Sequence, residues 1–282
     1  MYNNLKVNVF IFAGRKRNLE ILFPLLTSNI IDEITIGVNT LNVTDVEYIR
    51  NYVNSHCKFS MRSIPETLIG TPDAFKYMFT YMIDPETIYI KMDDDIMYIS
   101  EHFFEDLLEF RCNNERCNLV YPFIVNNPYC NVLANYFSTM FSNESDTMYN
   151  TWKSGKCAYF LHKAFCDGKL PKPPIMNVII NEKQAHFRPE LHTYVRPSIN
   201  TICFFGKECR DREWAKNMNP FLSDEQYLTY GMYRSDYYKN THSIIYTKPY
   251  CVHYAFGPQT DLLDKLNVRN LYQNLSSKLT TK

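Results

Sequence analysis

Three consecutive aspartates, Asp93, Asp94 and Asp95, are the strongest candidates for chemistry in this chain of 282 residues. They follow the run from Thr87 to Met92, which predicts a buried strand that ends at them. In extended backbone, Asp93 and Asp95 point to one side and Asp94 to the other. Two carboxylates that face one site suit a hard divalent cation such as Mg²⁺ or Mn²⁺. The alternative is that the aspartates only cap the next helix or face solvent.

His253 is the second candidate ligand. It lies between hydrophobic residues in the aromatic-rich segment 252–259, near the end of the chain. A neutral imidazole is a competent metal ligand, although a lone histidine in such a place is more often structural. We therefore expect Asp93, Asp95 and His253 to hold the metal together, with Asp93 and Asp94 also placed to contact a nucleotide.

Asp224 and Glu225 stand at the start of a predicted helix over 223–230. Free N–H groups and the helix dipole favour carboxylates there. A carboxylate can also act as a general base, and Asp224 is the first candidate for that role and Glu225 the second. Ser223 and Gln226 fit a capping box, so a helix cap without chemistry remains the alternative.

Two other groups are expected to contact the nucleotide. The turn after the first strand offers backbone N–H groups and basic side chains, through Ala13, Gly14, Arg15 and Arg17. The exit of the third strand offers Thr71, Asp73 and Lys76. Further along, residue type alone suggests that a bound substrate, either the donor of a transferred group or its acceptor, is flanked by Trp152, Lys153, Lys156 and His162. The alternative for the basic turn is that it is simply solvated.

The first hundred residues alternate strand-like and helix-like runs, which predicts βαβ units and a mostly parallel sheet. The expected strands are 7–13, 32–38, 58–64, 87–92 and 119–125, and the expected helices are 18–28, 44–55 with a Thr44 cap, one from Thr71-Pro72, and 100–111. Residues 126–220 have weak periodicity, and short strands follow at 243–246 and 250–254. We predict one continuous α/β domain. Its Rossmann-like nucleotide-sugar-binding half covers 1–125, and its irregular acceptor-binding half, with the metal-ligand segment, covers 126–282.

The strand that ends in Lys91-Met92-Asp93-Asp94-Asp95, followed late in the chain by Val252-His253-Tyr254, resembles the GT-A class of glycosyltransferases. The resemblance covers residues 5–125 and 220–260. It implies that Asp93 contacts the ribose or metal, that Asp95 ligates the metal, and that His253 completes the coordination. In inverting members of this class the general base is commonly an acidic residue at a helix start, which implies that role for Asp224 or Glu225. The chain also resembles the small glycosyltransferases encoded by chloroviruses, in particular those that transfer xylose, which implies UDP-xylose as donor.

Composition limits the partners. Thirty Lys and Arg balance thirty Asp and Glu, so no overall basic field would recruit nucleic acid. The apolar run near the N-terminus is too short to cross a membrane. Nine scattered cysteines without a C-x-x-C pair suit a reducing compartment. We therefore expect a soluble, cytoplasmic protein, in the host-cell cytoplasm if it is viral.

These observations together predict a metal-dependent glycosyltransferase that uses a UDP-sugar donor, moves the sugar to a glycan hydroxyl, and inverts the anomeric centre. Two alternatives remain. A metal-dependent phosphoesterase also uses clustered carboxylates, although it usually needs more of them. A non-catalytic glycan-binding module would bind sugar without metal.

Overall fold

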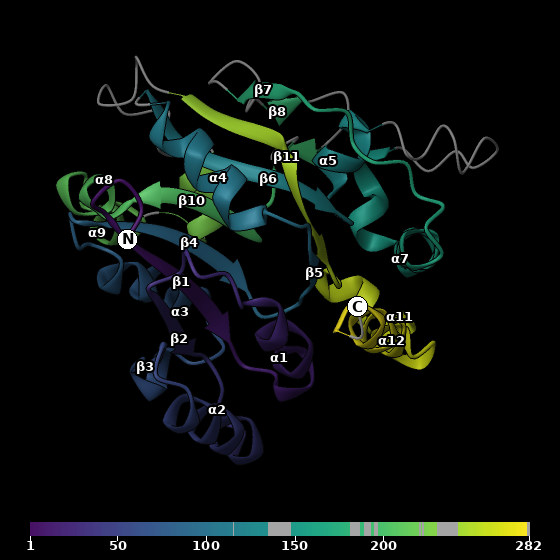
Figure 1. Cartoon of the computed structure of the whole chain (residues 1–282), viewed down its shortest axis with the longest axis horizontal. Helices are drawn as coiled ribbons and strands as arrows, with labels where there is room; N and C mark the ends of the chain where they lie inside the picture. Colours follow the sequence, from purple (N-terminus) through teal and green to yellow (C-terminus); the bar gives the residue numbers. More distant parts are fainter. Residues whose placement is uncertain are drawn as a thin grey trace.

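A mixed nine-stranded sheet forms the centre of the protein, with strand order β3-β2-β1-β4-β10-β6-β11-β5 and β7 paired to β11 (Figure 1). The computed structural model describes residues 1–114, 116–134, 148–180, 187–188, 193–194, 197–219, 221, 223–229 and 242–280. The sheet strands are β1 (Lys6–Ala13), β2 (Glu33–Val38), β3 (Phe59–Ser63), β4 (Thr87–Asp93), β5 (Ile96–Ile99), β6 (Cys117–Val125), β7 (Asn177–Ile180), β10 (Thr201–Phe205) and β11 (His242–His253). A separate two-stranded sheet pairs β8 (Phe187–Arg188) with β9 (Thr193–Tyr194).

The first four strands to pair are parallel, as the βαβ pattern predicts. β1 lies between β2 and β4, with Ala13 opposite Val38 and Phe12 opposite Asp93. Apolar side chains cover both faces of β1 and β4, and both strands are buried along almost their whole length. This is typical of strands with helices on each side. Their carboxyl ends therefore meet at one edge of the sheet, where the aspartates lie.

The strand β10 was not predicted. It comes from the segment with weak periodicity and lies antiparallel between β4 and β6. Thr201 is paired with Met92, so the residues just before β10 arrive beside the end of β4. The strand β5, which was also not predicted, pairs with the end of β11. The central sheet is thus continuous across residue 125.

The helices of the first half occur where they are predicted, with different ends. They are α1 (Lys16–Leu22), α2 (Val43–Ser55), α3 (Pro72–Met78) and α4 (Phe103–Cys112). The helix predicted over 18–28 begins two residues earlier and changes to a 3₁₀ turn at Phe23, where Pro24 lacks the N–H that would continue it. The predicted Thr44 cap is wrong: the Asn42 side chain accepts hydrogen bonds from the N–H groups of Thr44 and Asp45.

The second half adds short helices around the sheet: α5 (Pro128–Leu133), α7 (Gly155–Cys166), α8 (Gly206–Asp211), α9 (Trp214–Asn217) and α10 (Asp224–Thr229). The predicted end of the last of these, at residue 230, lies outside the described residues. The two predicted strands at 243–246 and 250–254 form one strand, β11. Two helices, α11 (Thr260–Lys265) and α12 (Val268–Thr280), follow it and lie beside α1 and α7 (Figure 1). None of the described helices is long and apolar enough to cross a bilayer.

Candidate functional site

Asp93, Asp95 and His253 meet at the carboxyl edge of the sheet. One ligand atom from each lies within 4.8 Å of the others. Asp93 is the last residue of β4, and Asp95 follows two positions later. His253 is the last residue of β11, which pairs with β5, the strand that begins directly after Asp95. The backbone N–H of Tyr254 donates to the Asp95 carbonyl at 2.8 Å, which fixes the two chain segments against each other. Residues 158 positions apart in the sequence are therefore brought to one place.

The geometry of this cluster fits a divalent cation. Two oxygen or nitrogen ligands at about 2.1 Å from one ion lie no more than about 4.2 Å apart, so a small adjustment brings all three ligands onto one ion. The Asp95 Oδ1 atom is buried and accepts no hydrogen bond, and it lies 3.4 Å from His253 Nε2. His253 Nδ1 is also buried without a partner. Buried polar atoms without partners are costly, and an ion bound by Asp95 and His253 would remove part of that cost at the Asp95 oxygen.

Charge around the cluster is balanced by Arg15. Its guanidinium lies 3.1 Å from Asp95 Oδ2 and also pairs with Asp94. Burial favours a neutral Asp95, but His253 and Arg15 together hold the pKa of Asp95 well below its usual value. Burial would lower the pKa of His253, yet Asp95 raises it above its ordinary value. The Arg15 side chain is 40% exposed, so part of it is accessible to an anionic ligand.

Asp94 holds the turn after β1 in place, unlike Asp93 and Asp95, which are candidate metal ligands. Its side chain is 3% exposed and accepts hydrogen bonds from the Gly14 N–H at 2.9 Å and from Arg15 Nε at 3.0 Å. It therefore holds the turn after β1 against the end of β4. A Cβ on Gly14 would lie 2.8 Å from the Asn39 carbonyl oxygen, so only glycine fits this turn. Ala13, the last residue of β1, is fully buried.

Asp93 is oriented by two neighbours. Lys91 Nζ donates to its Oδ1 at 2.6 Å and Asn200 Nδ2 donates to its Oδ2 at 3.0 Å. Lys91 is only 2% exposed, also donates to the Ile199 carbonyl, and lies over the Phe12 ring at 4.8 Å. Asp93 itself is 25% exposed, which leaves its carboxylate accessible.

Asp224 lies in the same electrostatic environment as Lys91 and Asp93. It is the first residue of α10, which packs against α3, and it is 6% exposed. Burial raises the pKa of the Asp224 carboxyl to about 6; nearby Lys91 lowers it in part, while Glu225 and Asp93 raise it further. A carboxyl whose pKa lies near the working pH is suited to general acid–base chemistry.

Glu225 faces another neighbour and accepts a hydrogen bond from Ser198 Oγ at 3.2 Å. Ser223 Oγ accepts from the Gln226 N–H, so the cap of α10 forms with Ser223 and leaves the Asp224 carboxyl available.

The segment behind His253 is tied to the rest of the protein through Tyr254. Its carbonyl accepts hydrogen bonds from Asn126 Nδ2 at 2.9 Å and makes one with His162 Nε2 at 2.7 Å. Its hydroxyl donates to Asp264 at 2.7 Å, and the Arg269 guanidinium stacks 4.0 Å from its ring centre. Every polar group of Tyr254 thus fixes the backbone next to a metal-ligand candidate.

The side chains of the other predicted nucleotide contacts each make a hydrogen bond or ion pair within the protein. Arg17 pairs with Asp264 at 2.8 Å and so joins α1 to α11. Thr71 Oγ1 donates to the Leu68 carbonyl at 2.7 Å, at the start of α3. Asp73 and Lys76 form an ion pair at 2.8 Å, in which Lys76 is buried and Asp73 exposed. Their contact with a nucleotide stays a prediction.

The segment around Trp152 lies beside the metal-ligand segment. Gln259 Nε2 donates to the Thr151 carbonyl at 3.0 Å, and the Lys153 ammonium lies 5.0 Å from the Trp152 ring centre. Lys153 and Lys156 are exposed. His162 was expected beside a ligand, but it is fully buried, and its two ring nitrogens lie 2.6 Å from the Tyr272 hydroxyl and 2.7 Å from the Tyr254 carbonyl. Burial lowers its pKa to about 4, so it is a neutral structural residue.

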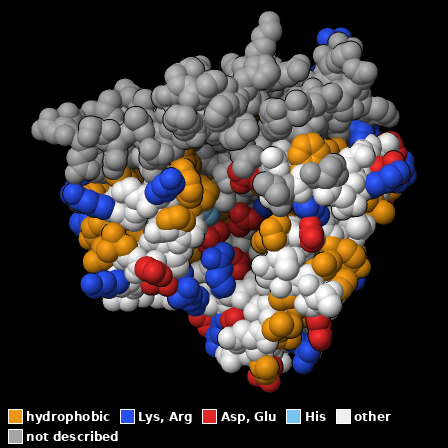
Figure 2. All heavy atoms as spheres, turned by 180° about the vertical axis from the view of Figure 1, so that it is seen from behind, with side chains coloured by type: hydrophobic (Ala, Val, Ile, Leu, Met, Phe, Trp, Pro, Cys, Tyr) orange, Lys and Arg blue, Asp and Glu red, His pale blue; other side chains and the backbone are white. Residues whose placement is uncertain are grey.

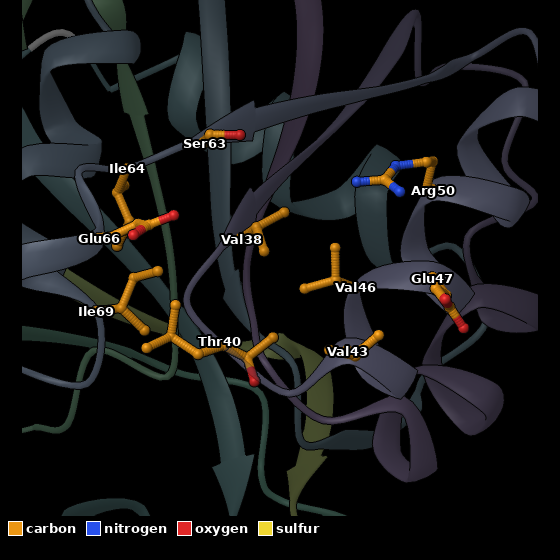
Figure 3. Close-up of a pocket in the computed structure, with 11 residues that line it drawn as sticks. Val38, Thr40, Val43, Val46, Glu47, Arg50, Ser63, Ile64, Glu66 and Ile69 are labelled. Atoms are coloured by element: carbon orange, nitrogen blue, oxygen red, sulfur yellow. The ribbon is translucent and has the colours of Figure 1, made fainter.

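The molecular surface is hollowed on one face, and Figure 2 shows acidic side chains deep in this hollow with basic side chains at its border. A pocket of about 400 Å³ lies at the ends of β2 and β3. We call it the Val38 pocket; Figure 3 shows apolar side chains from α2 facing those from the β3 exit across it, with lining residues that include Val38, Val43, Val46, Ile64, Ile69 and Arg50. Val38 is paired with Ala13, so the pocket lies about two strand spacings, roughly 10 Å, from β4.

Sequence reasoning missed three contributors to the site. Asn200 and the Ile199 carbonyl orient Asp93 and Lys91, and Tyr254 anchors the segment of His253. The apolar run Thr201–Phe205 is the signal that could have revealed β10, and with it the position of Asn200. Lys91 was part of the recognised motif, but its role depends on those two neighbours.

Comparisons with known proteins support the fold. No protein-family model and no curated protein matches the chain. A solved structure of 4-diphosphocytidyl-2C-methyl-D-erythritol synthase from Anaerococcus prevotii DSM 20548 is similar over 97% of each chain, with 12% identity and a TM-score of 0.50. CMP:2-keto-3-deoxy-manno-octonic acid synthetase, solved with CTP, is similar over 95% of this chain and 99% of that one, with 10% identity and a TM-score of 0.47. The expected α/β, Rossmann-like fold with a mostly parallel sheet is thereby confirmed.

Proposed function

We propose that this chain is a glycosyltransferase that requires a divalent cation and transfers a sugar from a UDP-sugar to a hydroxyl of a glycan. The observation that carries the proposal is the meeting of Asp93, Asp95 and His253 beside the buried carboxyl of Asp224. The first group fits a cation and the second fits a base. UDP-xylose is the first donor to test, because the chain resembles chloroviral enzymes that transfer xylose.

In the proposed reaction, Asp224 accepts the proton of the acceptor hydroxyl while that oxygen attacks the anomeric carbon. The bond from this carbon to the diphosphate breaks, its electron pair leaves with UDP, and attack from the opposite face inverts the centre. Asp93, Asp95 and His253 would hold Mn²⁺ or Mg²⁺, which neutralises charge on the diphosphate when bound. The accessible part of Arg15 is placed to contribute a fixed positive charge.

The Val38 pocket supports a nucleotide donor. Its distance of roughly two strand spacings from β4 is comparable to the reach of a nucleoside whose diphosphate lies at Asp93 and Asp95. Its apolar floor and charged border suit a flat base. We therefore place the nucleoside toward this pocket and the sugar toward Asp224.

Nucleotidyl transfer is the second candidate. The similar synthase from Anaerococcus is named for a product that contains a diphosphocytidyl group, and a metal beside carboxylates would serve that reaction too. A phosphoesterase is less well supported, because Asp93, Asp95 and His253 are the only candidate metal group among the described residues.

One experiment separates these reactions. Purified protein with Mn²⁺ is given UDP-xylose, UDP-glucose, UDP-galactose, UDP-GlcNAc or GDP-sugars together with glycan acceptors, and in parallel CTP or UTP with sugar phosphates. Release of UDP that requires acceptor and is abolished by EDTA supports glycosyl transfer. Release of pyrophosphate from the nucleoside triphosphates would replace the proposal with nucleotidyl transfer, and metal-independent sugar binding without turnover would replace it with a glycan-binding module.

A further inference from the structure

A second pocket lies on the face of the sheet that α3 covers, away from the metal-ligand candidates. It has a volume of about 200 Å³. We call it the Asn8 pocket; six of the residues that line it are Asn8, Phe10, Thr35, Arg62, Tyr81 and Tyr89. Asn8 is paired with Tyr89, which lies four residues before Asp93 on β4. The two sites are therefore about 13 Å apart along the strand, at roughly 3.3 Å per residue.

The polar groups of this pocket leave specific hydrogen-bonding capacity unused. Asn8 is 6% exposed, and its Nδ2 donates to Glu33 and to Thr35 Oγ1, but its Oδ1 is buried without a partner. Arg62 is exposed, and its guanidinium makes no hydrogen bond or ion pair with another residue in the described part of the chain. Two residues that line the same small space thus carry a buried acceptor without a partner and a planar set of donors.

The charges in the pocket cancel. Lys6 pairs with Glu33 at 2.6 Å, and Thr87 Oγ1 donates to Asp84 at 2.7 Å. Arg62 and Asp84 complete a set of two cations and two anions. A strongly charged ligand such as a nucleotide would therefore gain little here, whereas a neutral molecule with several hydroxyls could use both the free acceptor and the free donors.

The volume of the Asn8 pocket also favours a small ligand. The volume is below the roughly 300–1,000 Å³ of pockets for drug-sized ligands, but several times the roughly 30 Å³ share of one water. Phe10, Tyr81 and Tyr89 are among the lining residues, but most of the surface that faces the pocket is polar, which suits a molecule that carries several hydroxyls. We propose that the Asn8 pocket binds one neutral sugar ring, separately from the donor and the cation.

Saturation-transfer NMR with free xylose, glucose and galactose tests this, in EDTA and without nucleotide, on wild type, Arg62→Ala and Asp224→Asn. Loss of a hydrogen bond from the charged Arg62 guanidinium should weaken binding about tenfold or more in Arg62→Ala, while Asp224→Asn should bind as wild type. Arg50→Ala is the matched control, because Arg50 is an exposed arginine of the other pocket. Methyl xyloside and a xylose disaccharide, used as further probes, distinguish a free monosaccharide from a unit of a glycan.

Absence of saturation transfer, or equal affinity in wild type and Arg62→Ala, would overturn the proposal and leave a pocket that holds water only. Loss of binding in Asp224→Asn alone would instead place the sugar in the catalytic hollow. Because this assay needs neither donor nor metal, its outcome is separate from that of the UDP-sugar experiment. UDP-sugar turnover by Arg62→Ala should equal that of wild type, which checks that the variant is folded.

Discussion

At the start of α10, burial raises the pKa of the Asp224 carboxyl to about 6. A general base must be ionised, so kcat/KM should fall as the pH drops through this value. Asp224→Asn should lower kcat by about 10²–10⁴-fold and remove this acidic limb from the pH profile. Steady-state rates of wild type and variant from pH 5 to 8 check both effects. A variant with near-normal turnover would exclude Asp224 as the base.

The change Asp224→Asn, which should lower activity, should raise the stability of the folded protein at neutral and alkaline pH. Because its pKa is raised on folding, protonated Asp224 stabilises the folded state below about pH 4, and this contribution is lost as the pH rises through about 6. Above that pH the buried charge costs up to about 3 kcal/mol, which Asp224→Asn removes. Urea unfolding at pH 8 should therefore show a more stable variant, with little difference at pH 4. Lower stability of the variant at pH 8 would contradict this.

Asp95 should determine metal affinity. Removing one of three protein ligands should weaken Mn²⁺ binding by at least about 10–100-fold, since even indirect partners of ligands have effects of that size. Titration of Mn²⁺ followed by electron paramagnetic resonance measures this for Asp95→Ala. Asp211→Ala is the control, because Asp211 is an exposed carboxylate on α8. Unchanged Mn²⁺ affinity in Asp95→Ala would remove the cation from the proposed site.

At the scale of elements, the end of β11 depends on helices that follow it in the chain. Tyr254→Phe removes only the hydroxyl that donates to Asp264 and keeps the ring under Arg269. We expect a loss of about 1 kcal/mol in unfolding free energy and a several-fold weaker affinity for Mn²⁺, with kcat at saturating metal little changed. Thermal unfolding and Mn²⁺ titration measure the two.

Tyr246→Phe is the matched control for that variant. Tyr246 lies on the same strand, and its hydroxyl makes no hydrogen bond to another described residue, whereas its ring stacks on Phe110. Equal Mn²⁺ affinities in the two variants would mean that the Tyr254 hydroxyl does not position His253.

The strands also differ in whether their type and position could be predicted from the sequence. β1, β2 and β4 are long, almost wholly apolar runs, so their type, order and the position of the aspartates at the strand end could be predicted. β10 has only five residues, and its place between β4 and β6 depends on pairing with residues more than eighty positions away. The role of Asn200, which orients Asp93, depends on this placement of β10 and was not predicted, whereas Asp93, Asp95 and His253 could be proposed from residue type and position.

At the scale of the whole molecule, the donor should extend from the cation to the Val38 pocket. Val46→Trp should fill part of this pocket, because Val46 faces it from α2 (Figure 3). We expect KM for the UDP-sugar to rise about tenfold or more, with Mn²⁺ affinity unchanged. Thr44→Trp is the control, because it places the same side chain on an exposed position of α2 that is not among the pocket residues. Equal KM values would place the nucleoside elsewhere.

The insertion of β10 beside β4 also predicts how the chain can be divided. Residues 1–125 alone would leave the β4 edge, which β10 normally covers, without its hydrogen-bonding partner. This fragment should therefore aggregate or unfold, even though it contains the complete βαβ pattern. Expression of 1–125 and of the full chain, compared by circular dichroism and gel filtration, checks this; a monomeric, cooperatively folded fragment would contradict it.

The same strand order has a consequence during synthesis. β4 leaves the ribosome more than a hundred residues before β10, and β11 follows later still, so the sheet cannot close in the order in which its strands are made. Contacts between distant parts of a chain slow folding and leave apolar strands exposed while they wait. The nascent protein should consequently depend on chaperones until about residue 253 has emerged. The cluster of Asp93, Asp95 and His253 would then form in the last steps of folding.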